Sequence, residues 1–358
     1  MADVEPIYRE IASKMVKEQN RTLPRVIKKV ANLEQARILR ELPNTAEAVS
    51  KKLGLDQATV ERDLQYLFER GLATFGRHKG WSLVNNVVLV KDLVGSANPK
   101  YDDIELFDLL HEMSLEDSDD LAERVKRGEK VPPVIPVMRV LPKWRTVKDI
   151  PGLLPVEDVR EIFKNPPIVV HNCPCRVVYR SRPCKGTVPV DICLAVGSNG
   201  RSFLRRGAGK EITYDEVIAL LDKLEEAFPL VSTAGNSNTM PNILCSCCND
   251  CCGLFVKAAR TKPVLGKVPY AKSRFVVEDD PDECTACGIC TDNRCPVGAI
   301  TMKDFPELGG ERSYTNVDEC IGCGLCVLTC PNDARKMKLV RPPEHITDPA
   351  SIFDALTD

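Results

Sequence analysis

Eight cysteines in the last quarter of the chain have a spacing that suits metal binding. They form two motifs, Cys284-x2-Cys287-x2-Cys290-x4-Cys295-Pro296 and Cys320-x2-Cys323-x2-Cys326-x3-Cys330-Pro331. A tight Cys-x2-Cys-x2-Cys loop wraps three thiolates around one 4Fe-4S cluster, and the fourth thiolate comes from elsewhere. Glycines between the ligands leave room for backbone N–H groups to approach the cluster sulfurs: Gly288, Gly322 and Gly324. Structural zinc also uses paired Cys-x2-Cys motifs, but two Cys-Pro ends favour two iron–sulfur sites.

The two motifs belong to an internal repeat. Asp282-Glu283-Cys284 recurs as Asp318-Glu319-Cys320, and each motif closes with Cys-Pro. Strand-like segments flank both motifs, at residues 276–277 and 299–303 in the first half and at 315–317 and 336–340 in the second. Each half is therefore predicted to be a strand, a cysteine loop, a short turn or helix, and a second strand.

From about residue 274 to 341 the chain resembles the bacterial-type two-cluster 4Fe-4S ferredoxin module. In that module the cysteine before proline binds the cluster of the other half. The resemblance therefore implies one cluster on Cys284, Cys287, Cys290 and Cys330 and a second on Cys320, Cys323, Cys326 and Cys295. The chain departs from the pattern by four residues instead of three between Cys290 and Cys295, and by a longer excursion at 305–312.

A second group of nine cysteines lies in the middle of the sequence. Its members are Cys173, Cys175, Cys184, Cys193, Cys245, Cys247, Cys248, Cys251 and Cys252. The first four are close enough in sequence to hold one tetrahedral zinc ion or a third 4Fe-4S cluster. Neighbouring cysteines point in different directions, so one cluster does not use all of the last five. Three roles stay open for these five cysteines. Some could complete the site of the first four, some could hold another cluster, and one could be a reactive thiol.

The order of these features suggests a wider resemblance, over about residues 130–341. A Cys-x-Cys-Arg motif at 173–176 is followed by spaced cysteines, a helix with Glu-Ile-Thr-Tyr-Asp-Glu, the run Cys-Ser-Cys-Cys-Asn-Asp-Cys-Cys and the two repeats. This order is similar to a family of iron–sulfur proteins common in anaerobic bacteria. The resemblance implies a metal-bearing centre beside the two-cluster module and a role in electron transfer, but it implies no substrate.

The N-terminal part resembles a winged helix-turn-helix. Capping signals and apolar spacing predict helices at 32–42, 44–54 and 56–71, followed by a hairpin at 72–84. The third helix would enter the DNA major groove, yet it carries the acidic residues Glu61, Asp63 and Glu69 against Arg62 and Arg70. DNA binding needs cations to neutralise phosphates, so a protein-docking or structural role is the preferred interpretation.

The rest of the chain gives the domain plan. We expect an amphipathic helix at 104–113, a solvated acidic stretch at 116–120 and a proline-rich, extended linker at 132–142. A capping box of Thr213 and Glu216 predicts a helix ending at Phe228. The fold class is α+β, with a winged-helix-like domain at 1–95, a helical or linker region at 96–165, a central cysteine-rich α+β region at 166–272, the ferredoxin-like domain at 273–341 and a tail at 342–358.

Composition agrees with a reducing compartment. The chain has 358 residues, 17 cysteines and a net charge of −2. An odd cysteine total with adjacent pairs is unlike an extracellular disulfide framework. No signal peptide or membrane-spanning segment is predicted, so a cytoplasmic protein, in an anaerobic host, is expected. We expect no nicotinamide or flavin cofactor, because Gly207-x-Gly209 lacks the third glycine of the dinucleotide fingerprint.

These patterns predict an electron-transfer protein, working as a subunit or adaptor of an oxidoreductase complex rather than as a free-standing enzyme. Two clusters, together with a central cluster or zinc site, would pass single electrons to or from a redox partner protein. Two alternatives belong to other classes. A redox-sensing transcription regulator would use the N-terminal domain on DNA, and a reductase would have its active site at Cys245–Cys252.

Overall fold

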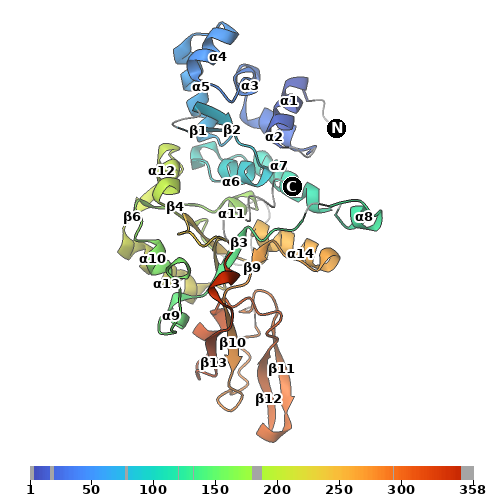
Figure 1. Cartoon of the computed structure of the whole chain (residues 1–358), viewed down its shortest axis with the longest axis vertical. Coiled ribbons are helices and arrows are strands. Elements are labelled where there is room, and N and C mark those ends of the chain that lie inside the picture. Colours follow the sequence, from blue (N-terminus) through green and yellow to red (C-terminus); the bar gives the residue numbers. More distant parts are fainter. Residues whose placement is uncertain are drawn as a thin grey trace. The chain divides into compact units, whose positions relative to one another are not determined.

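The structure is a computed structural model of the whole chain (Figure 1), and it describes residues 4–16, 20–76, 80–119, 121–131, 133–179, 188–292 and 294–347. The chain divides into two compact units. The first consists of Met1–Val131, His171–Asp191 and Ser202–Lys210, and the second of Pro132–Val170, Ile192–Arg201 and Glu211–Asp358. Helices and strands are mixed, as expected for the α+β class. The domain boundaries predicted at residues 95, 165, 272 and 341 stay predictions.

The first unit is mainly helical. Its helices are α1 (Pro6–Met15), α2 (Leu23–Val30), α3 (Leu33–Arg40), α4 (Ala46–Leu53), α5 (Gln57–Glu69), α6 (Val87–Gly95), α7 (Ile104–Asp119), α8 (Leu121–Lys126) and α11 (Pro174–Val178). Strands β1 (Ala73–Gly76) and β2 (Gly80–Leu83) pair in an antiparallel hairpin. One apolar core joins these elements and includes Ile11, Ile27, Leu39, Leu64 and Val177.

The predicted helical segments before the hairpin are present, with their capping explained by side chains. Asn32 begins α3 in a capping box with Gln35, and Asp56 accepts a hydrogen bond from Thr59 N at the start of α5. The prediction that Asn44 caps the second helix is wrong. Thr45 is the N-cap of α4, because Asn44 is instead paired through its backbone with Trp81 of β2.

Helix α7 is longer than predicted and contains Glu116, which the sequence placed in a solvated acidic stretch. The side chain of Glu116 is only 9% exposed. Its Oε1 accepts hydrogen bonds from Arg21 N and Nε at 2.8 Å, and its Oε2 accepts one from Thr22 N at 3.1 Å. Glu116 therefore anchors the segment that leads into α2, and the solvated interpretation is wrong for this residue.

The second unit contains a mixed sheet and most of the cysteines. Its helices are α9 (Trp144–Val147), α10 (Val159–Ile162), α13 (Tyr214–Ala227), α14 (Gly253–Leu265) and α15 (Leu325–Leu328). A seven-stranded sheet has the order β6-β4-β5-β8-β7-β3-β9. Its strands are β3 (Met138–Leu141), β4 (Ile168–Asn172), β5 (Asp191–Val196), β6 (Gly209–Ile212), β7 (Val231–Gly235), β8 (Ile243–Cys247) and β9 (Tyr270–Ala271), and α12 (Gly197–Arg205) follows β5.

Strand β3 lies inside the segment predicted to be an extended linker. It pairs antiparallel with β7 and parallel with β9, and Val140 and Leu141 are buried. The linker interpretation is therefore wrong for residues 138–141. By contrast, α13 begins with the predicted capping box, in which Thr213 Oγ1 accepts from Glu216 N and Glu216 Oε2 accepts from Thr213 N.

The repeat segment supplies the last four strands (Figure 1): β10 (Phe275–Asp279), β11 (Ile300–Phe305), β12 (Gly310–Thr315) and β13 (Arg335–Leu339). The strand that opens the first half, β10, pairs antiparallel with β13, which closes the second half, and Phe275 lies opposite Leu339. The two inner strands, β11 and β12, also pair antiparallel. The strand-loop-strand plan of each half is confirmed.

None of the helices within the described ranges is long and apolar enough to cross a membrane.

Candidate metal centres

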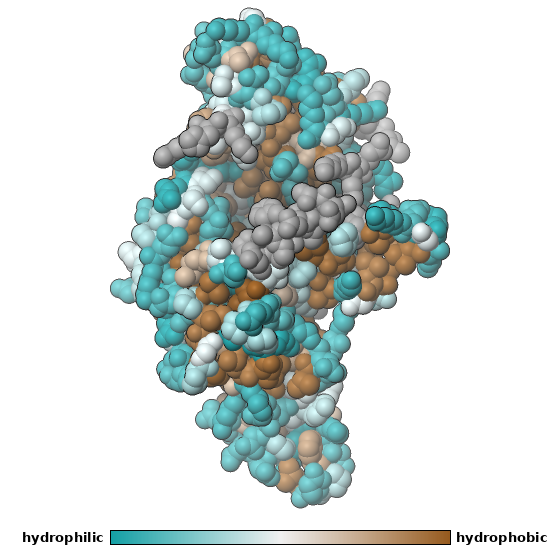
Figure 2. All heavy atoms as spheres, viewed as in Figure 1, coloured by the Kyte–Doolittle hydropathy of each residue, from teal (hydrophilic) through white to brown (hydrophobic). Residues whose placement is uncertain are grey.

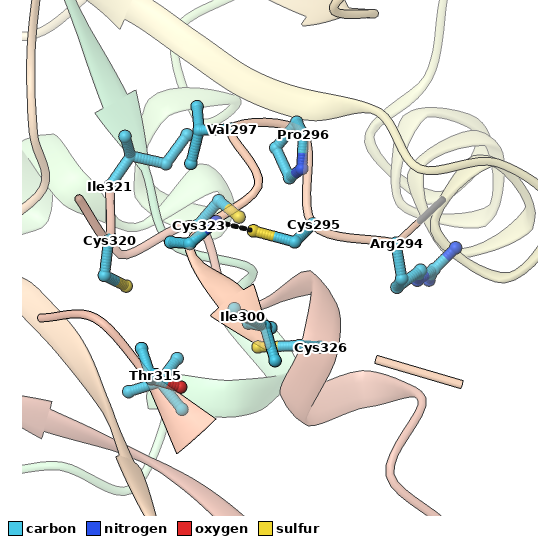
Figure 3. A pocket seen from close by; sticks show the side chains of 13 residues that line it. Arg294, Cys295, Pro296, Val297, Ile300, Thr315, Cys320, Ile321, Cys323 and Cys326 are labelled. Atoms are coloured by element: carbon cyan, nitrogen blue, oxygen red, sulfur yellow. Dashed lines mark hydrogen bonds between the residues drawn. The ribbon is translucent and has the colours of Figure 1, made fainter. Parts of the chain in front are cut away.

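Four of the predicted ligands line one cavity in the repeat segment. They are Cys295 from the first motif and Cys320, Cys323 and Cys326 from the second, and Figure 3 shows their side chains around this space. Apolar side chains, including Val277, Val297, Ile300 and Ile321, complete the wall. Cys295 therefore lies with the three cysteines of the second motif, as expected if the cysteine before proline binds the cluster of the other half. Their role as ligands remains a prediction.

Two glycines in the second motif are required by close packing. Gly322 and Gly324 have φ angles of 68° and 80°, which favour residues without a side chain. A Cβ on Gly322 would lie 2.0 Å from Phe275 O, and one on Gly324 would lie 2.6 Å from Thr146 Oγ1. The loop can therefore fold tightly against β10 and α9 and direct three cysteines to one side.

The thiols of this second set lie in an apolar surrounding. Burial raises the pKa of Cys323 to about 12 and also raises the pKa of Cys326. Burial disfavours a thiolate without a compensating charge, so these sulfurs would bind iron as thiolates only because the metal supplies that charge. Ala299 N donates a hydrogen bond to Cys295 Sγ at 3.2 Å, which is the kind of contact that tunes a cluster.

Buried cations surround the second set. The Lys143 backbone N donates to Cys323 O at 3.0 Å, and its Nζ donates to Ser232 Oγ at 2.9 Å. Arg294 donates to Leu325 O at 3.3 Å from Nε and to Glu225 O at 2.7 Å from Nη2. These positive side chains favour the more negative, reduced state of a cluster held there.

The first set of predicted ligands is more exposed. Cys287 is exposed and Cys290 is buried, and the other two members, Cys284 and Cys330, are partly exposed. Asn332 Nδ2 donates to Thr285 Oγ1 at 2.6 Å. This bond ties the loop that follows Cys330 to the loop that follows Cys284, as a shared cluster requires.

Cys284 of the first set has contacts with Ser313. Ser313 N donates to Cys284 Sγ at 3.4 Å, and Ser313 Oγ lies 3.5 Å from the same sulfur. Burial acts to raise the pKa of Cys284, but the contacts with Ser313 outweigh it and lower this pKa. Cys284 therefore forms a thiolate more readily than the buried Cys323 and Cys326 of the second set.

Comparison with known proteins agrees with this geometry. The sequence of residues 283–335 matches a family described as the 4Fe-4S dicluster domain. This part of the chain is a 4Fe-4S dicluster domain. The chain is also 36% identical, over 104 residues, to an uncharacterized ferredoxin of Methanocaldococcus jannaschii. The similarity covers 28% of this chain and 53% of the relative, so the chain spans about half of that protein's length. No solved structure matches the chain.

The residues of the dicluster domain fit iron–sulfur clusters. The fit is carried by four thiols around one apolar cavity, by N–H donors to cysteine sulfurs, and by buried cations beside them. When bound, a 4Fe-4S cluster supplies one-electron oxidation and reduction. The chain's own part is to hold it with cysteines and to set its electrostatic surroundings.

The central run of cysteines forms two close pairs in the second unit. Cys248 Sγ lies 2.7 Å from Cys251 Sγ, and Cys252 Sγ lies 3.2 Å from Cys247 Sγ. Cys247 ends β8 and Cys252 is the N-cap of α14, so a turn brings each pair together. Adjacent cysteines have different partners, as predicted. A carboxylate oxygen of Asp250 and the sulfurs of the Cys248–Cys251 pair all lie within 4.8 Å of one another.

The other central cysteines are divided between the units. Cys193 of β5 and Cys245 of β8 lie on neighbouring strands, next to the paired residues Leu194 and Leu244. Cys173 and Cys175 lie in the first unit. The predicted ligand Cys184 lies outside the described residues. A single site on the first four cysteines stays a prediction.

In the first unit, Cys175 has a cationic neighbour. Lys91 Nζ donates to Cys175 Sγ at 3.1 Å and lies 2.8 Å from Asp92 Oδ1. Arg176 is buried and donates to Pro189 O at 3.2 Å. His171 is buried and stacks on Phe203 at 3.9 Å, which makes it a core residue.

Sequence reasoning missed the buried cations. Arg294 directly precedes Cys295, and Arg335 lies shortly after Cys330-Pro331, so their closeness to ligands in sequence was a usable signal. Lys143 gave no such signal, because its contact with Cys323 joins residues far apart in the chain.

Proposed function

We propose that this protein passes single electrons between a redox partner and a centre inside its second unit, through the dicluster domain. The observation that carries the proposal is the unequal burial of the two cysteine sets. Residues 320–326 are all buried, whereas the loop at 282–289 is largely exposed. An exposed cluster suits exchange with another protein, and a buried one suits internal relay.

The exposed loop has an acidic rim. Asp282, Glu283 and Asp292 are exposed around the first set, and Ile289 is 46% exposed. On the face shown in Figure 2, the end of the molecule that holds β11 and β12 in Figure 1 is mainly hydrophilic, with scattered apolar residues. The rim fits a partner with a basic patch, because complementary charge speeds association and fixes orientation. The partner is proposed to be an oxidoreductase or its electron donor.

The buried set lies beside the central cysteines. Cys323 shares one apolar cluster with Cys247 and Cys252. Asn249 Nδ2 donates to Pro296 O at 3.1 Å, and Pro296 lines the cavity of the second set. We therefore place a further redox or metal centre at the central cysteines, as the inner end of the path.

The helices and hairpin at the N-terminus are proposed to form a winged-helix-like domain that docks protein. The cations of α4 support this over DNA binding. Lys51 Nζ lies 2.6 Å from Glu47 Oε1, and Lys52 Nζ lies 2.5 Å from Glu41 Oε2. Arg70 is buried over the ring of Tyr101 at 4.6 Å. The two lysines are paired with carboxylates of the same unit and Arg70 is buried, whereas a DNA reader presents its cations to phosphates.

The full chain, purified and reconstituted without oxygen, tests the function. We expect at least about eight iron atoms and eight sulfides per chain, the content of the two clusters of the dicluster domain, with reversible one-electron reduction followed by electron paramagnetic resonance. A chain that binds less than one cluster, or clusters that cannot be reduced and reoxidised, would overturn the proposal.

A charge variant tests the entry site. Asp282→Asn with Glu283→Gln is expected to slow reduction by a basic donor protein several-fold and to weaken the dependence of the rate on salt. Glu307→Gln, at an exposed carboxylate in the β11–β12 connection, is the matched control and should leave the rate unchanged.

A further inference from the structure

The two close sulfur pairs of the central run differ from the thiols of the dicluster cavity. Cys248 and Cys251 approach to 2.7 Å, whereas no sulfur–sulfur hydrogen bond joins the four described cysteines around that cavity. We propose that Cys248 and Cys251 are a redox-active dithiol that converts reversibly to a disulfide, with iron–sulfur clusters of the dicluster domain as its electron donor and acceptor. This inference rests on the proposed function.

The separation of the sulfurs favours bond formation over metal binding. Two thiolates on one tetrahedral zinc ion lie roughly 3.8 Å apart, because each Zn–S bond is about 2.3 Å. The separation between Cys248 and Cys251 is shorter than this, and closing to a disulfide requires a further approach to about 2.05 Å. The Cys-x2-Cys spacing is one at which thiols become reactive.

The electron count suits the dicluster domain. Reduction of the disulfide breaks one S–S bond, takes up two electrons and two protons, and leaves two thiols. Each 4Fe-4S cluster exchanges one electron, so a domain with two clusters holds the two electrons that one disulfide needs. Oxidation of the dithiol returns two electrons and releases two protons.

The position of the pair limits where electrons and protons come from. Cys248 and Cys251 are 7% and 1% exposed, so a protein thiol in solution does not reach them. The bond from Asn249 to Pro296 fixes their loop to the second cluster site. Asp250 is half-buried, and one of its carboxylate oxygens lies within 4.8 Å of both sulfurs, where it can hold and return a proton.

The test uses the reconstituted full chain, poised without oxygen at a series of potentials. Thiols are trapped with one alkylating reagent, disulfides are then reduced and trapped with a heavier one, and both cysteines are quantified by mass spectrometry. We expect Cys248 and Cys251 to change together, with the disulfide-to-dithiol ratio changing tenfold for about 30 mV, the slope of a two-electron couple.

Two variants give the contrast. In Cys248→Ser, Cys251 should stay alkylated at every potential while iron remains at about eight atoms. Lys257→Gln, at an exposed residue of α14 outside the cysteine run, should leave the couple intact. The inference is overturned if the wild-type pair is alkylated at all potentials, or if metal beyond the two clusters is present and is lost in Cys248→Ser. The proposed function fails separately, through absent or irreducible clusters.

Discussion

Arg335 and Asp279 face each other across the outer strands of the dicluster domain, with Arg335 Nη2 3.2 Å from Asp279 Oδ1. Both contact Thr315 Oγ1, which accepts from Arg335 Nη1 at 3.0 Å and donates to Asp279 Oδ1 at 2.9 Å. Arg335 is buried, and Thr315 lines the cavity of the second cysteine set. A fixed positive charge therefore lies behind the wall of that cavity.

Replacing Arg335 should change the potential of the second cluster. Arg335→Gln removes a buried cation that favours the reduced state, so the reduction potential should fall, although Asp279 offsets part of this charge. Arg335→Lys keeps the charge and should shift it less. Redox titration with electron paramagnetic resonance measures the shift. Lys336→Gln, at an exposed neighbour on β13, is the control, and an equal shift there would contradict the assignment.

The partition of cysteines between clusters is testable by counting iron. Cys295→Ser and Cys330→Ser should each remove one cluster, about four iron atoms. Combining Cys295→Ser with Cys320→Ser should remove no more iron than either change alone, because both hold the second cluster.

Combining Cys295→Ser with Cys284→Ser should remove both clusters. If that pair instead costs only one cluster, each motif binds its own four cysteines and the crossed arrangement is wrong.

Breaking the buried ion pair of Lys143 and Glu225 should lower the stability of the protein, because one desolvated charge then loses its partner. The two charged groups are 3.4 Å apart and each side chain is 3% exposed. Lys143→Met should lower the free energy of unfolding by about 3–5 kcal/mol, because it leaves a buried carboxylate poorly compensated. The double variant Lys143→Met with Glu225→Met should recover much of the loss. Urea unfolding followed by the fluorescence of Trp144 measures both, and an equally unstable double variant would speak against the explanation.

Glu116 should support the first unit at neutral pH and lose its effect in acid. Burial acts to raise its pKa, but hydrogen bonds from Arg21 and Thr22 lower it below the ordinary value of 4.5. The folded state thus binds the proton more weakly than the unfolded state. The stability contribution is complete above about pH 4.5 and falls as the pH drops through the folded pKa.

Glu116→Gln should cost about 1.5–3 kcal/mol at pH 7, the range for hydrogen bonds to a charged group. The fluorescence of Trp81 in a Trp144→Phe background reports on the first unit. Glu112→Gln on the same helix is the control, because Glu112 is 54% exposed in its ion pair with Arg25 and should change stability by less than about 1 kcal/mol.

Sequence predicted what depends on local spacing. The cysteine motifs imply strand, loop and strand because a cluster fixes the geometry of residues close in sequence, and Asn32, Asp56 and Thr213 mark helix starts through bonds within one turn. Sequence failed where partners are distant. Residues 138–141 form β3 because they pair with β7 and β9, which lie far away in the sequence. Glu116 is buried because α7 packs on the start of α2.

The pairing of β10 with β13 has a consequence for how the dicluster domain joins the chain. Since Phe275 lies opposite Leu339, the domain's entry and exit meet at one place. A segment with joined ends can be inserted into a host fold, or exchanged for another, without displacing the strands around it. The same arrangement lets the cluster-binding unit behave as a cassette, whose redox properties can change while the rest of the protein keeps its architecture.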